Sequence, residues 1–184
     1  MASPGPRLTA DGLLPGARFV PSPNQDARPA GDTISLVVVH AISLPPGEFG
    51  GVDVERFFAN HLDAAAHPYY ESIRDLRVSA HFFIRRRGDV VQFVPTAARA
   101  WHAGVSAWRG RERCNDFSIG IELEGSDDQA FTPIQYIRLA RLIRALRRTY
   151  RIEDVVGHAD IAPQRKTDPG PLFDWARLRK LLRR

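Results

Sequence analysis

The residues whose types and spacing could do chemistry are concentrated between positions 157 and 170. This stretch follows a short apolar run and holds a histidine, two aspartates and a lysine among residues that turn or stiffen the backbone. Pro169 fixes its own φ and restricts the residue before it, so we expect Asp168 to be held in extended backbone. His158 at the start of the stretch and Asp168 near its end are therefore predicted to converge on one point.

Lys166 lies in the same stretch and is of an unusual type for this chain. Of the 26 basic residues, only Lys166 and Lys180 are lysine. Lysine carries a compact charge whose pKa responds to burial, whereas arginine is a planar fork that stays protonated. Two interpretations stay open: a compact charge is needed beside a site, or a lysine stands here by chance.

A second histidine, His40, ends the strongest predicted strand. The run from Ile34 to His40 is rich in β-branched residues without alternation, which is typical of a strand buried on both faces. A rigid sheet positions what the adjoining loop exposes, so ends of buried strands suit ligand-binding side chains. The alternative is a buried imidazole that only hydrogen-bonds.

Glu122 lies in a predicted strand, 117–124, that alternates cleanly. Its apolar residues fall on one face, and Glu122 and Glu124 fall on the other beside small residues that leave room there. Two glutamates on a solvent face would need no explanation. Strand geometry alone therefore does not make Glu122 catalytic.

His40, His158 and Asp168 would together offer two imidazoles and a carboxylate to a metal ion. Three protein ligands and an open fourth position are the pattern of a catalytic zinc site, and zinc lowers the pKa of its bound water toward about 7. Glu122 and Lys166 are then available to move a proton and to stabilise an oxyanion. The spacing alone is weak support, because no HExxH helix or CxxC pair is present.

A rival metal site would use His158 and Asp160 as the His-x-Asp of a non-haem iron facial triad. That triad needs another histidine, normally downstream. No histidine follows His158.

The remaining patterns predict the elements that position these residues. Three helices are expected: one at about 52–61, one that begins with Thr132 as N-cap and Pro133 as first helical residue, and one from about Asp174. Strands are expected at 78–85 and 90–94, paired across a turn. Residues 66–70 and 101–105 are expected to be loops, and the second loop has an aromatic side chain that could wall a pocket. The result is a single α/β domain with α+β character, in which helices flank a central mixed β-sheet.

Composition favours one soluble domain. The chain has 184 residues, 43% of them hydrophobic and 26% charged, which is ordinary for a globular protein with a real core. A single cysteine, Cys114, excludes an intramolecular disulfide and fits a reducing compartment. Prolines and glycines break any signal-peptide pattern in residues 1–20, and no apolar segment approaches the roughly 20 residues of a membrane span. We therefore expect a cytoplasmic protein without a membrane partner.

The net charge of +5 raises the question of an anionic partner. Many arginines, however, fall on predicted helices, where a solvated face is the usual arrangement. No nucleic-acid-binding module or basic stripe with interleaved aromatics is evident, so we expect no nucleic-acid partner.

Four segments, in this order, carry a resemblance to a known family. They are VVHAISLPPGEFGG at 38–51, RAWHAGV at 99–105, CNDFSIGIELEG at 114–125 and GHADIAPQRKTDPG at 157–170. Together they closely resemble the type 2 N-acetylmuramoyl-L-alanine amidases, the family that includes peptidoglycan recognition proteins. The similarity runs from about Pro21 to Trp175, and we expect a lead-in at 1–20 and a zinc amidase domain of that fold at 21–184.

The resemblance implies hydrolysis of the amide between the lactyl group of (1,6-anhydro-)N-acetylmuramic acid and the L-alanine of a muropeptide. By motif match, His40, His158 and Asp168 correspond to the ligands of one Zn²⁺ per chain, Glu122 to the catalytic acid/base, and Lys166 to the group that stabilises the tetrahedral intermediate. Five further positions fall near the substrate groove of the family: Tyr69, Arg77, Trp101, Arg113 and Asn115. The family role is cell-wall recycling, which in many bacteria also sets the muropeptide signals that induce β-lactamase. We expect a monomer.

One position departs from the family pattern. Asparagine is expected after the first histidine ligand, and this chain has Ala41. Ala159 and Gln164 also differ, but neither is a predicted ligand or catalyst. The alternative of another class is a muropeptide-binding protein that keeps the fold and does not hydrolyse.

Overall fold

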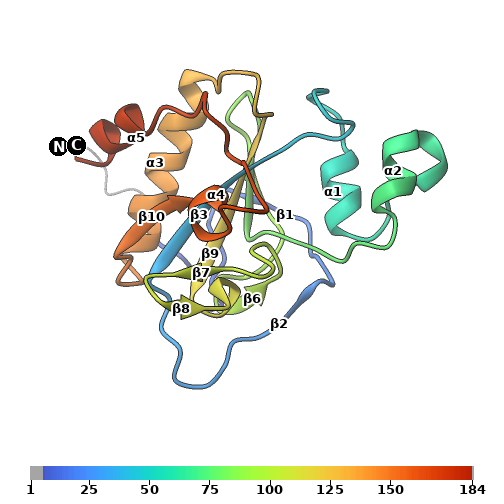
Figure 1. Ribbon diagram of the computed structural model, residues 1–184. Helices are drawn as coiled ribbons and strands as arrows, with labels where there is room; N and C mark the ends of the chain where they lie inside the picture. Colours follow the sequence, from blue (N-terminus) through green and yellow to red (C-terminus); the bar gives the residue numbers. More distant parts are fainter. Residues whose placement is uncertain (1–5, 184) are drawn as a thin grey trace.

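A computed structural model describes residues 6–183 of the protein (Figure 1). Six strands form its central sheet. Their spatial order is β1-β5-β4-β9-β3-β10, and every neighbouring pair is parallel except β4 with β5. The strands are β1 Arg18–Phe19, β3 Leu36–Ile42, β4 Phe82–Ile84, β5 Val90–Gln92, β9 Ser118–Glu124 and β10 Asp154–Gly157. The predicted mixed sheet is confirmed.

The β3 strand is buried on both faces, as its β-branched run predicts. Val37, Val38 and Val39 have no exposed surface, and β3 lies between β9 and β10. The strand runs two residues past His40, and the register places His40 opposite Glu122 of β9. Two candidate site residues are therefore neighbours across one strand pair.

Helices cover both faces of the sheet (Figure 1). In β4, Phe82 and Ile84 belong to the core cluster that includes residues of α3 (Pro133–Arg147) and α5 (Trp175–Leu182). Phe83 points the other way and packs with residues of α1 (Asp53–Phe58) and α2 (Pro68–Ile73). Because side chains alternate along a strand, β4 joins two apolar layers.

The start of α3 is a capping box, as predicted. The side chain of Thr132 accepts from the backbone N–H of Gln135, and the side chain of Gln135 accepts from the backbone N–H of Thr132. Gln135 is fully buried, and its Nε2 also donates to the carbonyl oxygens of Ile84 and Glu124. These bonds fix α3 to the ends of β4 and β9.

The prediction of a loop at 66–70 is wrong. A 3-10 turn at Ala64–Ala66 leads into α2, which begins at Pro68. The Nδ1 of His67 accepts from the backbone N–H of Tyr69 and caps the helix, and Pro68 supplies a φ suited to a first helical residue. Histidine is an uncommon cap, so the sequence did not show this helix start.

Shorter elements complete the fold. They are the strand pairs β2 Gln25–Ala27 with β6 Ala98–Ala100 and β7 Ala107–Trp108 with β8 Arg111–Glu112, the 3-10 turn Cys114–Asp116, and the short helix α4 His158–Ile161. In the lead-in, β1 pairs with β5, whereas residues 1–5 lie outside the described part of the chain; the boundary at residue 20 stays a prediction. Among residues 6–183, no helix is both long and apolar enough to cross a membrane.

Candidate metal centre and its pocket

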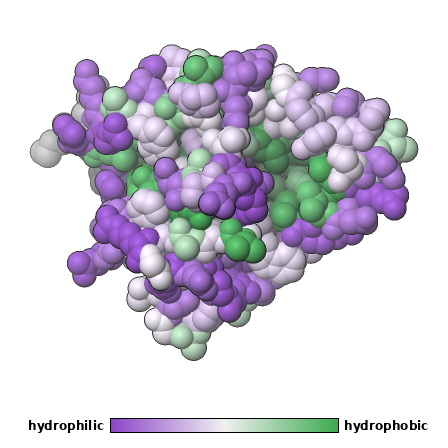
Figure 2. Space-filling view, viewed as in Figure 1, coloured by the Kyte–Doolittle hydropathy of each residue, from purple (hydrophilic) through white to green (hydrophobic). Residues whose placement is uncertain are grey.

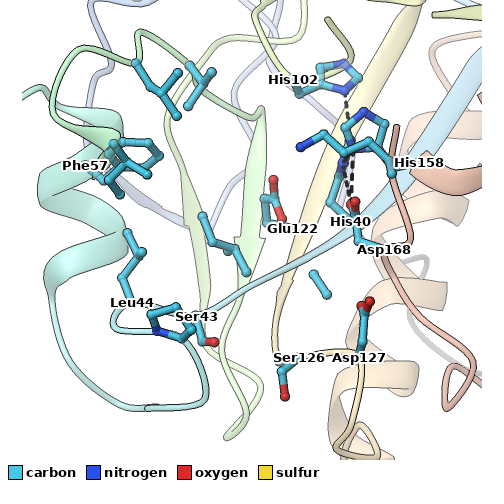
Figure 3. A pocket seen from close by; sticks show the side chains of 18 of the residues that line it. His40, Ser43, Leu44, Phe57, His102, Glu122, Ser126, Asp127, His158 and Asp168 are labelled. Carbon is cyan, nitrogen blue, oxygen red and sulfur yellow. Dashed lines mark hydrogen bonds and ion pairs between the residues drawn. The ribbon is translucent and has the colours of Figure 1, made fainter. Parts of the chain in front are cut away.

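Three side chains that are far apart in sequence meet at one point (Figure 3). Nδ1 of His40 lies 3.0 Å from Nδ1 of His158 and 3.1 Å from Oδ2 of Asp168. Nδ1 of His158 lies 3.2 Å from the same carboxylate oxygen. The predicted convergence of these three residues is therefore confirmed, and each offers one ligand atom within 4.8 Å of the others.

Each donor is positioned by a different part of the fold. His40 comes from the buried strand β3, and His158 is the first residue of α4, directly after β10. Asp168 follows in the loop after α4, where its carbonyl oxygen accepts from the backbone N–H of Ala159. This bond ties the two ends of the 157–170 stretch together.

Asp160, the carboxylate of the rival iron triad, is engaged elsewhere. Its Oδ2 accepts from the backbone N–H of Gly157 at 2.7 Å, which holds the start of α4. Among the described residues, the group of potential ligands around His158 contains Asp168 and not Asp160.

The protonation states of His40 and Asp168 favour binding of a cation. Burial lowers the pKa of His40 to about 4, against the opposing hydrogen bond with Asp168. Burial would raise the pKa of Asp168, but hydrogen bonds with His158 and His40 outweigh it and hold that pKa well below its usual range. Neutral imidazole and ionised carboxylate are the states that bind metal, so the donor set fits a divalent metal ion.

A cavity of about 580 Å³ opens beside this group. One wall carries His40, His158, Lys166 and Asp168, and the facing wall is apolar. The apolar wall comes mainly from α1 and α2 and the segment after α2: Phe57, Phe58, Ile73, Leu76 and Val78. Figure 2 shows this side of the molecule hollowed, with hydrophobic surface inside the hollow. The cavity can therefore hold a ligand with both polar and apolar parts.

Glu122 lines the cavity between these walls (Figure 3). Both faces of β9 are buried, so the interpretation of Glu122 as a solvent-facing residue is wrong. Within the described residues, its buried Oε2 has no hydrogen-bond partner. Burial, and next the charge of Asp168, raise the pKa of Glu122 well above its usual value, while Lys166 acts in the opposite direction. The carboxyl group is thus suited to hold a proton and to exchange it in the cavity.

Glu124, the second glutamate on this face of β9, has a structural role. Its Oε1 accepts from the backbone N–H of Gly50, and its Oε2 accepts from that of Arg86. The carboxylate therefore anchors two loops and differs from Glu122 in having both oxygens bonded.

Of the five positions predicted near the substrate, only Tyr69 is among the described residues that line this cavity. Arg77 is exposed and donates to the carbonyl oxygens of Arg74 and Leu76. Arg113 is exposed and pairs with Asp116.

Trp101 and Asn115 lie deeper and do not line the cavity. Trp101 is half-buried and is not among the described residues that line this cavity, so its predicted place near the substrate stays a prediction. Asn115 uses its Oδ1 to accept from the backbone N–H groups of His102 and Ala103.

The sequence reasoning missed His102 as a member of the site. Its Nδ1 lies 2.9 Å from Nε2 of His40, and it lines the cavity. The available signal was its place in the RAWHAGV segment, one of the four that carried the family resemblance.

Comparison with known proteins agrees with this geometry. The family profile of N-acetylmuramoyl-L-alanine amidase matches residues 30–171, so the chain belongs to this amidase family. The chain is 58% identical to the 1,6-anhydro-N-acetylmuramyl-L-alanine amidase AmpD of Escherichia coli K12, over 95% of this chain and 97% of that protein.

Solved structures show the same likeness. A crystal structure of a selenomethionine derivative of AmpD superposes with a TM-score of 0.93, at 58% identity, over 95% of this chain and 99% of that one. The amidase AmiD from E. coli, in complex with anhydro-N-acetylmuramic acid-L-Ala-D-γ-Glu-L-Lys, gives a TM-score of 0.60 at 32% identity, over 95% of this chain and 65% of that one. The predicted fold class is confirmed.

Proposed function

We propose that this protein is a zinc-dependent amidase that hydrolyses the bond between (1,6-anhydro-)N-acetylmuramic acid and L-alanine in muropeptides. The observation that carries the proposal lies in one cavity: the group of His40, His158 and Asp168, called here the metal group, is beside Glu122, whose buried Oε2 has no hydrogen-bond partner among the described residues. The names of the similar proteins supply the substrate class.

His40, His158 and Asp168 would hold one Zn²⁺ per chain. Two imidazoles and a carboxylate are a common ligand set of catalytic zinc, and three protein ligands leave a position open. Bound zinc supplies Lewis-acid chemistry, which polarises a carbonyl oxygen and lowers the pKa of water.

Glu122 and Lys166 would divide the remaining chemistry. Glu122 lines the cavity, where its carboxyl group would take a proton from the attacking water and deliver it to the leaving amide nitrogen. Lys166 lines the same cavity, and its positive charge stabilises the negative charge that develops on the carbonyl oxygen of the substrate.

The apolar wall suits the less polar parts of the substrate. Tyr69 and Leu76 line the cavity and are 41% and 50% exposed, so a bound muropeptide would cover part of their surface. Arg77, Trp101, Arg113 and Asn115 were expected to contact substrate from the family motifs, but in the described structure they do not line the cavity.

The proposal extends to the setting of the reaction. The protein would act as a monomer in the cytoplasm on fragments released from the cell wall. The single free cysteine fits a reducing compartment, and the name of the related amidase supplies the anhydro-muropeptide substrate. The reaction would then belong to cell-wall recycling.

The direct test is incubation of the zinc-loaded protein with anhydro-muropeptide, with released peptide followed by mass spectrometry. Release of a peptide with L-alanine at its amino end is the expected result. Binding of the muropeptide without release of peptide would contradict the proposal and favour the alternative, a muropeptide-binding protein that does not hydrolyse. Glu122→Gln serves as the matched control, because it keeps the size of the side chain and removes its acid/base function.

A further inference from the structure

Both imidazoles of the metal group place their second ring nitrogen against the same short segment of chain. Nε2 of His40 lies 2.9 Å from Nδ1 of His102 (Figure 3). Nε2 of His158 lies 3.2 Å from the carbonyl oxygen of Ala103. All four residues are buried. One pair of consecutive residues therefore contacts the outer edge of both rings.

The contact with Ala103 determines which nitrogen of the His158 ring is free. The carbonyl oxygen of Ala103 can only accept, so the hydrogen bond requires the proton of His158 on Nε2 and leaves a lone pair on Nδ1. That Nδ1 is the atom 3.2 Å from Asp168. For His158, the segment selects the tautomer that a metal ion needs.

At His40 the partner of the second ring nitrogen is another histidine, His102. A lone pair on Nδ1 of His40 puts its proton on Nε2, which donates to Nδ1 of His102. The remaining nitrogen of His102, Nε2, lies 3.1 Å from Oγ of Ser118, which can accept its proton. The chain from His40 through His102 to Ser118 is therefore consistent with neutral imidazoles throughout.

The segment itself is held from behind by Asn115. Its Oδ1 accepts from the backbone N–H of His102 at 3.1 Å and from that of Ala103 at 2.8 Å. The ring of His102 also lies against Gly120, where an added Cβ would come 2.4 Å from Cγ of His102. The segment is thus fixed by a side-chain acceptor on one side and by β9 on the other.

We propose that His102 and Asn115 are positioning residues of the metal group. His102 sets the orientation and tautomer of His40, and Asn115 holds the backbone of His102 and Ala103, whose ring and carbonyl oxygen contact His40 and His158 respectively. This gives Asn115 a role through the metal ligands in place of a contact with substrate. The inference rests on the proposed function for the identity of the metal, and its test measures metal binding, not turnover.

The test is the zinc affinity of the full chain, measured by competition with a chromophoric chelator in two matched pairs of variants. His102→Phe keeps a ring but removes the acceptor, whereas His102→Asn keeps an acceptor at the position of Nδ1. Asn115→Ala removes the acceptor for both backbone N–H groups, whereas Asn115→Asp retains it. Val105→Ala is the control, because Val105 lies in the same loop and is 88% exposed.

Zinc affinity should fall about 10- to 100-fold in His102→Phe and Asn115→Ala, and stay within about 3-fold of wild type in His102→Asn, Asn115→Asp and the control. The visible absorption of the Co²⁺-loaded protein should change in the first two variants only. Unfolding temperatures of the metal-free variants separate a loss of fold from a loss of positioning.

Unchanged zinc affinity in folded His102→Phe and Asn115→Ala would overturn the inference, as would equal losses in Asn115→Ala and Asn115→Asp. If His102→Phe does not fold, the comparison of zinc affinity between Asn115→Ala and Asn115→Asp tests the inference. A wild type without zinc affinity would also overturn it. A wild type that binds zinc and releases no peptide from muropeptide would refute the proposed function and leave the positioning roles standing.

Discussion

A buried carboxylate oxygen without a hydrogen-bond partner destabilises a folded protein, and within residues 6–183 Oε2 of Glu122 has none. Glu124, two residues along the same strand face, has both oxygens bonded to backbone N–H groups. The difference between these two glutamates separates a functional from a structural carboxylate. Local sequence could not make this distinction, because both lie at equivalent positions of an alternating strand.

Because burial of the ionised Glu122 carboxylate destabilises the folded protein, Glu122→Gln should increase stability in a pH-dependent way. The pKa of Glu122 is raised in the folded protein, mainly by burial, so the folded state binds more protons than the unfolded state above the ordinary pKa of 4.5. Its contribution to stability is therefore lost as the pH rises from 4.5 toward the folded pKa. The metal-free variant should unfold at a higher temperature than metal-free wild type at pH 7, and at a similar temperature near pH 4.

Scanning calorimetry at the two pH values checks this prediction. A variant less stable than wild type at pH 7 would contradict it, because it would show that the ionised carboxylate of Glu122 does not destabilise the folded protein.

Lys166 and Asp168 lie two residues apart, and their substitutions should have different effects. Lys166→Ala should keep one zinc per chain and lower kcat by about 100- to 1000-fold, because it removes charge that stabilises the transition state. Asp168→Ala should lose the metal, because it removes a donor. Elemental analysis together with kinetics checks both variants; equal zinc loss in the two would contradict the division of roles.

Ala41 lines the cavity next to His40, where the family pattern has asparagine. If the family asparagine bonds to substrate, Ala41→Asn should lower KM by about 2- to 10-fold, the equivalent of one uncharged hydrogen bond. The zinc content should not change. Steady-state kinetics with anhydro-muropeptide measures the effect, and an unchanged or higher KM would show that the cavity of this chain is adapted to alanine.

At the scale of elements, local chemistry predicted those parts of the fold whose signals are strong. The capping box of α3 and the β-branched run of β3 were both predicted correctly. By contrast, α2 was missed, because its cap is His67 and the helix is only six residues long. Short helices depend on tertiary packing more than on propensity, so their sequences carry less information.

The bonds of Gln135 predict how strongly α3 supports the strands of the site. Gln135→Ala would leave the carbonyl oxygens of Ile84 and Glu124 without this donor, and should lower the free energy of unfolding by about 1 to 3 kcal/mol. Arg141→Ala, at an exposed position of the same helix, should change it by less than about 0.5 kcal/mol. Denaturant unfolding measures both, and equal effects would show that the buried bonds contribute little.

At the scale of the whole molecule, the motifs predicted three residues that the structure brings together, but not all of the contacts around them. His40 and Asp168 are 128 positions apart, and no local rule brings them together. The order of the family motifs predicted their convergence, which the parallel β10, β3 and β9 strands explain: their carboxyl ends lie at one edge of the sheet. The positioning of both imidazoles by residues 102 and 103 depends on side-chain geometry, which only the folded structure shows.

The most direct test of the account is zinc content and amidase activity measured in parallel, before and after chelation and again after metal is restored. The account predicts about one zinc per chain, loss of peptide release on chelation, and recovery of both together. Asp168→Ala should contain no zinc under the same conditions. Full activity in protein stripped of metal would contradict the central claim that His40, His158 and Asp168 hold the ion on which amide hydrolysis depends.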